Sequence, residues 1–261
     1  MGEVIIMIKI RNKILFALIM FFVILIFNSI DVEAAGKYDY LILGDSLTSQ
    51  MYAAYTGSWN QFVQQSKTIN GKEVMFLGAG GYGYDYWFNN HYQDIQKALK
   101  NAKDGATCVI YLGGNDTGNG SKYATAISKM AAEFPKVNFY FCSYPPSTGR
   151  TSYNKEVDNL NKAVLNGIKS SARYNKNLFY KEINNKVISI GSTKKSLYHF
   201  IMDNSNYMQD PDHFGIDLYK AVWEQIMSKL TKGSDSSGSS SMIDNNRRLY
   251  NCWGFKNIRN I

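Results

Sequence analysis

The sequence is poor in proline, cysteine and histidine, with four, three and three of these residues among 261. The cysteines are Cys108, Cys142 and Cys252, an odd number without a CxxC pair. This pattern argues against a disulfide framework and a cysteine metal site, and Cys108 and Cys142 are interpreted as small buried hydrophobes in apolar runs. No cluster of His, Asp and Glu has the spacing of metal ligands, so we expect neither a metal nor another cofactor.

Blocks of like charge are also missing. Lys and Arg number 29 against 21 Asp and Glu, which gives a formal net charge of +8. The basic residues are scattered and match no nucleic-acid-binding motif, so we expect no nucleic acid partner. A basic chain of this kind is attracted to polyanions, and an anionic cell-wall polymer is the partner that we expect.

The one long apolar run lies near the N-terminus. Basic residues precede an apolar stretch at 14–27, and a small-x-small triplet follows at 32–34. The run of about 14 residues has the length of a signal-peptide core and falls short of the roughly 20 residues that span a bilayer. We interpret 1–35 as a signal peptide that leaves no membrane span after cleavage; an uncleaved membrane anchor is the alternative. Translation can start at Met1 or at Met7.

A second change of composition follows residue 232. Residues 233–241 consist of Gly, Ser and one Asp, which is typical of a flexible linker. The tail at 242–261 is too short to form a core of its own. It is either the remnant of a second module or a surface-binding tail. The chain is therefore predicted to hold one globular domain at 36–232.

Strand-like and helix-like segments alternate along this domain. Strands are predicted at 38–43, 73–77, 107–112, 137–142 and 178–183. Helices are predicted at 88–100, 121–134, 152–174 and 216–230. Such alternation indicates βαβ units, hence an α/β fold with a mostly parallel sheet that helices cover on both faces.

Candidate functional residues follow the first three predicted strands. These segments are Gly44-Asp45-Ser46-Leu47, a glycine-rich block at 78–83, and Gly113-Gly114-Asn115-Asp116. The carboxyl ends of parallel strands meet at one edge of a sheet, where ligands bind in α/β proteins. By itself, Gly-Asp-Ser is also typical of a simple turn. The coincidence of three such segments favours a site at this edge.

A serine hydroxyl needs a neighbouring base to act as a nucleophile. Of the three histidines, His213 lies in Asp210-Pro211-Asp212-His213, just before the last predicted helix. Asp210 can turn back to hold the imidazole, and Asp212 is the alternative partner. His91 and His199 lie in aromatic segments and are interpreted as structural.

An acyl-transfer site also needs hydrogen-bond donors for the oxyanion that forms on the attacked carbonyl. The Ser46 amide, a glycine amide of the block at 78–83 and the Asn115 side chain are the candidate donors. Asp116, next to Asn115, is interpreted as a loop-capping residue and not as an acid catalyst.

The three segments after the strands and Asp210-Pro211-Asp212-His213 form four blocks. In this order, these blocks resemble those of the SGNH hydrolases, the GDSL family of lipases and esterases. The resemblance implies a flavodoxin-like three-layer α/β/α sandwich with a five-stranded parallel sheet of order 2-1-3-4-5. It also implies Ser46 as nucleophile, His213 as base, Asp210 as orienting acid, and an oxyanion hole of Ser46, Gly80 and Asn115. Gly81 is the alternative to Gly80, because Leu77-Gly78-Ala79 stands where the family carries an asparagine.

Aromatic residues crowd the segments beside these blocks. Tyr82, Tyr84 and Trp87 follow the glycines closely and are predicted to contact the substrate. They interleave with Gly, Asp and Asn in a segment expected at the site, where aromatic faces can stack on sugar rings or line an acyl pocket.

Together the motifs predict an exported serine esterase that removes a small acyl group, acetyl as first choice, from a small molecule or a carbohydrate such as a wall glycan. The carbohydrate part rests on export, basic charge and aromatic residues. Lysophospholipases and thioesterases use the same constellation and are alternatives. A wall-binding protein that keeps the fold without turnover is the non-enzymatic alternative.

Overall fold

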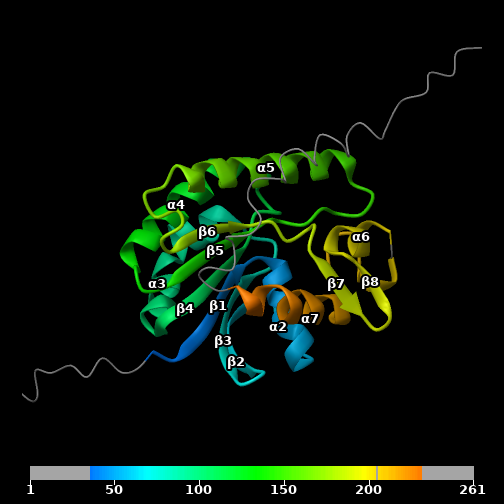
Figure 1. Ribbon diagram of the computed structural model, residues 1–261, viewed down its shortest axis with the longest axis horizontal. Coiled ribbons are helices and arrows are strands. Elements are labelled where there is room, and N and C mark those ends of the chain that lie inside the picture. Colours follow the sequence, from blue (N-terminus) through cyan, green and yellow to red (C-terminus); the bar gives the residue numbers. More distant parts are fainter. Residues whose placement is uncertain (1–35, 204, 231–261) are drawn as a thin grey trace, which may run out of the picture. The chain divides into compact units, whose positions relative to one another are not determined.

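A computed structural model describes residues 36–203 and 205–230 (Figure 1). The predicted signal peptide at 1–35, the linker at 233–241 and the tail at 242–261 lie outside the described residues. Within the described ranges, no helix has the length and apolar character needed to cross a membrane.

The described part of the chain is built on a six-stranded sheet of order β2-β3-β1-β4-β5-β6. Its parallel strands are β1 (Tyr38–Gly44), β3 (Lys72–Ala79), β4 (Ala102–Tyr111), β5 (Asn138–Cys142) and β6 (Leu178–Lys181). These five strands have the predicted relative order 2-1-3-4-5, so the α/β prediction is confirmed. The prediction of a sheet with only five strands is wrong, because β2 (Phe62–Ile69) joins the edge antiparallel to β3.

The extra strand β2 is joined to β3 by a two-residue hairpin turn. Asn70 and Gly71 both have positive φ, 50° and 75°, as a type I′ turn requires. The strand shows no apolar alternation, because of its eight residues only Val63 and Ile69 are buried. The Asn-Gly pair is thus the sequence signal for this hairpin.

Helices cover both faces of the sheet (Figure 1). On one face α2 (Ser46–Thr56) packs against α7 (Ile216–Gln225). The other face carries α3 (Tyr92–Lys100), α4 (Gly120–Glu133) and α5 (Thr151–Lys169), of which α4 and α5 pack together. The result is the three-layer α/β/α arrangement that the alternation of segments predicts.

Smaller elements fill the connections. A π-helix, η1 (Asp85–Asn90), precedes α3, so the helix predicted at 88–100 is two elements. The α-helices in the ranges 152–174 and 216–230 end at Lys169 and Gln225. The remaining elements are η2 (Thr117–Asn119), β7 (Val187–Ile190), β8 (Thr193–Ser196), α6 (Leu197–Met202), η3 (Ser205–Tyr207) and η4 (Met227–Lys229).

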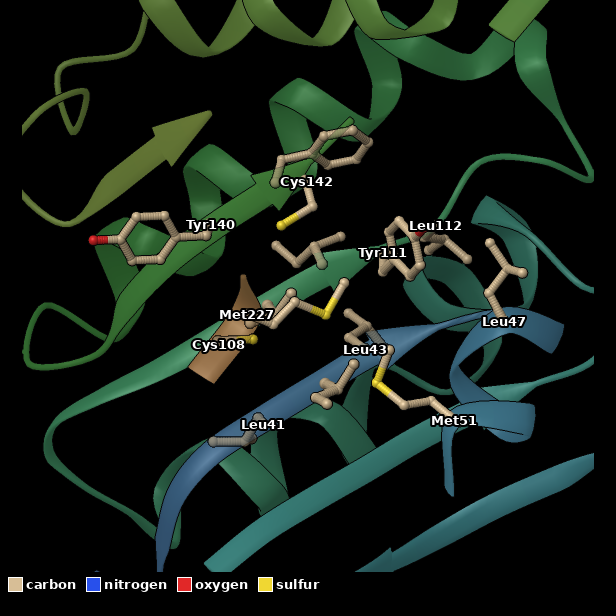
Figure 2. Packing of buried hydrophobic residues seen from close by; sticks show 14 of the residues in the cluster. Leu41, Leu43, Leu47, Met51, Cys108, Tyr111, Leu112, Tyr140, Cys142 and Met227 are labelled. Carbon is tan, nitrogen blue, oxygen red and sulfur yellow. The ribbon is translucent and has the colours of Figure 1, made fainter. Parts of the chain in front are cut away.

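The junction of β1 and α2 is tightly packed. Figure 2 shows side chains of this junction beside the end of β4; they are Leu43, Leu47, Met51, Tyr111 and Leu112. A Cβ at Gly44 would overlap the Thr48 side chain and the Tyr111 carbonyl, so only glycine lets α2 start this close to the sheet.

Cys108 and Cys142 lie in the same core, reduced and buried, as the sequence predicts (Figure 2). Burial raises the pKa of the Cys108 thiol to about 12. This cysteine is therefore a packing residue without thiolate reactivity at neutral pH.

Candidate active site

Ser46 is the first residue of α2, directly after the carboxyl end of β1. The buried Asp45 caps the helix, and its Oδ1 accepts a hydrogen bond of 3.1 Å from the Leu47 amide. Amides of the first helical turn lack intrahelical acceptors, so the Ser46 N–H is available to a ligand. The Ser46 hydroxyl reaches His213, with Oγ 2.9 Å from Nε2.

The loop before α7 holds His213 through Asp210. The His213 Nδ1 atom lies 2.9 Å from Oδ1 and 2.8 Å from Oδ2 of Asp210. The same carboxylate accepts the backbone N–H groups of Asp212 and His213, both at 2.9 Å. Burial opposes ionisation, but the His213 side chain and these amides hold the pKa of Asp210 below its ordinary value. Asp210 is thus a carboxylate at neutral pH and fixes the imidazole.

Asp212 does not orient His213. It forms an ion pair with Arg150, whose Nη1 lies 3.0 Å from Oδ1 and 2.8 Å from Oδ2. The Arg150 guanidinium also lies over the Tyr153 ring, 4.5 Å from its centroid. Of the two candidate carboxylates, the structure therefore brings only Asp210 to the imidazole.

The other two histidines lie away from Ser46, in local structural roles. His91 stacks on Tyr86 with ring centroids 4.2 Å apart, and its Nδ1 lies 3.0 Å from Asp94. His199 sits in α6, where its Nδ1 lies 2.7 Å from the hydroxyl of the cap residue Ser196.

The glycine chosen for the candidate oxyanion hole changes from Gly80 to Gly81. The Gly80 amide donates to the Gln61 carbonyl at 2.8 Å, which extends the pairing of β2 with β3 by one residue. The Gln61 side chain in turn donates to the Gly80 carbonyl at 3.0 Å. Because its N–H is already used, Gly80 is not available as the donor. The Gly81 amide has no partner among the described residues, and its φ of 84° suits glycine, so Gly81 replaces Gly80 in the candidate set.

Asn115 lies in the loop after β4 and is exposed. Its Nδ2 donates to the Tyr82 carbonyl at 3.1 Å, so one hydrogen of the NH₂ group is used and the other remains for a ligand. This bond joins the loop that carries Asn115 to the loop that carries Gly81. Two of the three candidate donors are thereby held in a fixed relation.

Asp116 also links the same two loops. Its Oδ2 accepts the Tyr84 amide at 2.7 Å and the Asn119 side chain at 3.0 Å. Its Oδ1 accepts the Tyr123 hydroxyl at 2.6 Å. With both oxygens engaged in loop contacts, Asp116 has the capping role that the sequence predicts.

These groups line a cleft of about 850 Å³, within the range of small-molecule sites. Ser46, Gly81, Asn115 and His213 share the cleft with residues that sequence reasoning did not single out as site residues. The additional lining residues include Gln50, Gln61, Tyr144, Arg150, Tyr153 and Glu156, and the aromatic Trp59 after α2 lines the cleft as well. Among the residues with described side chains, no group of His, Cys, Asp and Glu has the arrangement of a metal site.

Sequence signals for some of these lining residues exist. Tyr144 follows β5 as Ser46 follows β1, and the strand-end rule applies to it equally. Arg150, Tyr153 and Glu156 recur every three residues at the start of α5, which places them along one side of the helix.

The three aromatic residues predicted to contact the substrate do not line the cleft. Trp87 is fully buried, and its Nε1 donates to the Gly44 carbonyl at 2.9 Å, so it supports the end of β1 from inside the core. Tyr84 stacks on Phe88 with centroids 5.1 Å apart. Tyr82 is not among the lining residues and keeps 41% of its surface exposed. A buried Trp87 cannot touch a substrate, so the prediction is wrong for Trp87.

Asp45 is a buried carboxyl beside the nucleophile. It is fully buried, and its Oδ2 has no partner that satisfies hydrogen-bond geometry. Burial raises the pKa of Asp45 to about 6, although the Leu47 amide, the Tyr144 hydroxyl and the Gly114 amide oppose the shift. The folded protein therefore binds a proton at Asp45 at a pH where the unfolded chain does not.

This shift predicts a pH dependence of stability. Because the folded pKa lies above the unfolded value, Asp45 stabilises the fold fully below about pH 4, and this contribution is lost as the pH rises through about 6. Asp45→Asn removes the titration but keeps an oxygen for the Leu47 amide. In urea unfolding, the wild type should lose on the order of 3 kcal/mol relative to this variant between pH 4 and pH 7.5. Parallel pH profiles for the two proteins would contradict this assignment.

No family model matches the chain, and no curated protein sequence matches it. Solved structures of similar fold include a catalytic mutant of an acetylxylan esterase from Geobacillus stearothermophilus, at 10% identity and a TM-score of 0.46, over 73% of this chain and 93% of that one. A family 3 carbohydrate esterase from Clostridium thermocellum is 16% identical with a TM-score of 0.45, over 80% and 97%.

A third solved structure is described as a GDSL-like lipase from Bacteroides ovatus. It is 11% identical with a TM-score of 0.47, over 73% of this chain and 51% of that one.

Proposed function

We propose that the chain is a serine esterase of the SGNH hydrolase type that releases small acyl groups, acetyl in the first place. The observation that carries the proposal is the row of hydrogen bonds from Ser46 Oγ to His213 Nε2, at 2.9 Å, and from His213 Nδ1 to Asp210, at 2.8 Å. This is the geometry in which a base activates a hydroxyl and a third group orients the base.

The proposed reaction begins with acyl transfer to the enzyme. Ser46 Oγ attacks the ester carbonyl while His213 Nε2 takes the hydroxyl proton, and Asp210 stabilises the imidazolium that forms. The carbonyl oxygen becomes an oxyanion, for which the amides of Ser46 and Gly81 and the Asn115 side chain are the donors. When the tetrahedral intermediate collapses, His213 gives its proton to the leaving alcohol.

The second half of the reaction releases the acyl group. A water molecule gives a proton to His213 and attacks the acyl-enzyme carbonyl, again with the oxyanion held by the same donors. Collapse of this intermediate returns the proton to Ser46 and frees the carboxylic acid. The kinetics are therefore expected to be ping-pong.

The lining of the cleft favours a polar alcohol part of the ester. Gln50, Gln61, Arg150 and Glu156 offer hydrogen-bonding groups beside the exposed ring of Trp59. A sugar presents hydroxyls and an apolar ring face, which match such a lining better than a long acyl chain does. An acylated carbohydrate, such as a wall glycan, is the substrate class that we propose.

Hydrolysis of p-nitrophenyl esters of increasing chain length tests the reaction class. We expect the purified protein to cleave the acetyl ester and to lose activity steadily with longer chains. A preference for long chains would instead indicate a lipase or lysophospholipase. A folded protein that cleaves no ester would support the alternative hypothesis of a non-enzymatic wall-binding protein.

We also propose that the protein is exported, on the sequence pattern of residues 1–35. N-terminal sequencing of the protein from the producing cell should find a start at or near Ala35, in the medium or the wall fraction. A chain that keeps its apolar run and stays in the membrane fraction would make this segment an anchor.

A further inference from the structure

Four rings form a continuous cluster beside the cleft: Phe62, Tyr82, Tyr86 and His91, here called the aromatic rim. The Phe62 centroid lies 5.4 Å from that of Tyr82 and 5.7 Å from that of Tyr86. Tyr82 and Tyr86 are 4.8 Å apart, and His91 stacks on Tyr86 at 4.2 Å. The reaction proposed above uses none of these side chains.

The aromatic rim begins where the cleft ends. Phe62 directly follows Gln61, and Tyr82 directly follows Gly81, and both preceding residues line the cleft. The Tyr82 backbone is also fixed to the site, because its carbonyl accepts the hydrogen bond from Asn115. A ligand that extends out of the cleft past the glycine loop therefore meets these rings first.

Two of the four rings of the aromatic rim are exposed, and the other two are partly buried. Phe62 and Tyr82 keep 47% and 41% of their surface exposed, and Trp59 in the neighbouring cleft wall keeps 59%. These are three of the six exposed large hydrophobic residues in the described part of the chain. Apolar groups that gather in the open mark interaction surfaces, whereas single exposed ones need no explanation.

Polar groups accompany the rings. Tyr82 and Tyr86 carry hydroxyls at the edges of their rings, and a phenolic hydroxyl can both donate and accept a hydrogen bond. At the far end, Asp94 accepts from the Gln64 side chain at 3.2 Å and lies 3.0 Å from the His91 Nδ1. The partner that fits has apolar faces and hydroxyl edges, and it carries no negative charge to meet Asp94. A neutral sugar chain meets these conditions, but an anionic lipid headgroup does not.

We infer that the aromatic rim binds the neutral sugar chain of a polysaccharide ester and directs the esterase toward polymeric substrates. The catalytic part of this inference rests on the proposed function, while binding of the chain by the rim does not. The rings would stack on sugar units beyond the one that carries the ester. The rim then determines which esters are cleaved efficiently without touching the reacting atoms.

The test compares two substrates of the full chain, p-nitrophenyl acetate and soluble acetylated xylan. In the double variant Phe62→Ala, Tyr82→Ala, the ratio of kcat/KM for the xylan to kcat/KM for the small ester should fall about tenfold, because two stacking contacts are lost. Tyr82→Phe, which keeps the ring, should retain most of the ratio. An unchanged ratio in the double variant overturns the inference.

Tyr198→Ala is the matched control. Tyr198 is 41% exposed, as Tyr82 is, but it lies on α6, and among the described aromatic rings it pairs only with that of its neighbour His199. This variant should leave the ratio as in the parent. A tenfold fall in this control as well would overturn a specific role for the rim.

A binding measurement separates this inference from the proposed function. In affinity electrophoresis through acetylated xylan, Ser46→Ala should be retarded, and Ser46→Ala with the double rim variant should migrate freely. If Ser46→Ala is retarded but the parent hydrolyses no ester, the inference about the aromatic rim holds and the esterase proposal is wrong. Free migration of Ser46→Ala overturns the rim. If the double rim variant loses activity only on long-chain p-nitrophenyl esters, the inference is overturned as well. A dimer that sedimentation detects in the parent but not in the double rim variant would also overturn it.

Discussion

Ser46→Ala should lower kcat for acetyl ester hydrolysis by roughly three or more orders of magnitude. The hydroxyl that lies 2.9 Å from His213 Nε2 is removed, so no acyl-enzyme can form. The helix, the cleft and all three candidate oxyanion donors remain, because only the Oγ atom is deleted and the backbone N–H of residue 46 is kept. The expected loss is therefore in kcat, with little change in the melting temperature.

The control for this prediction is Ser121→Ala, at an exposed position in the first turn of α4, which should match the parent in both measurements. The parent, Ser46→Ala and Ser121→Ala are compared by steady-state kinetics and by thermal unfolding. If Ser46→Ala retained activity within tenfold of the parent, Ser46 would not be the nucleophile.

The second large effect is expected at Asn115. If its free amide hydrogen meets the oxyanion and scarcely touches the neutral ester, Asn115→Ala should lower kcat by about 10² to 10³ with KM little changed. Asn115→Asp should be at least as harmful, since a carboxylate repels the oxyanion. Steady-state kinetics on p-nitrophenyl acetate provide the measurement.

A structural role for Asn115 must be separated from this one, because its side chain also bonds to the Tyr82 carbonyl. Tyr123→Phe is the control: it deletes a hydroxyl bonded to Asp116 in the same pair of loops, but it removes no oxyanion donor. We expect this variant to lose about 1 kcal/mol of stability while kcat stays within a few fold. Normal kcat with reduced stability in Asn115→Ala as well would remove Asn115 from the candidate site.

The parts of the fold that depend on parallel strands were predictable from sequence. Buried strands read as apolar runs, and parallel pairing brings their carboxyl ends together, so the positions of Ser46 and Asn115 follow from strand order alone. His213 could be chosen because the chain has only three histidines and one of them follows a carboxylate at a turn.

The choice between Gly80 and Gly81 as the candidate oxyanion donor could not be made from sequence, because it depends on a neighbouring strand. Gly80 and Gly81 look equivalent in sequence, and the difference arises when Gln61, next to β2, takes the Gly80 amide. β2 carries almost no apolar pattern, because it is an edge strand with one open side. The Asn70-Gly71 turn is the local signal that would have revealed it.

The aromatic contacts were predicted from the position of these residues directly after the glycine block, which does not distinguish a ring that faces solvent from one that faces the core. The π-helix η1 contains both Tyr86 and Trp87, yet Trp87 is buried against Gly44 while Tyr86 joins the rim. Neighbouring side chains on a helix point in different directions, so the position of each ring along η1 decides whether it faces the core or solvent.

Covalent labelling of the nucleophile tests the central claim, that Ser46 attacks the ester carbonyl, most directly. The protein is labelled with a serine-reactive fluorophosphonate and digested, and the peptides are mapped by mass. We expect one label, on the peptide that contains Ser46, and no label in Ser46→Ala. Pretreatment of the parent should abolish ester hydrolysis in proportion to labelling. A label on another residue, or full activity in the labelled protein, would contradict the account.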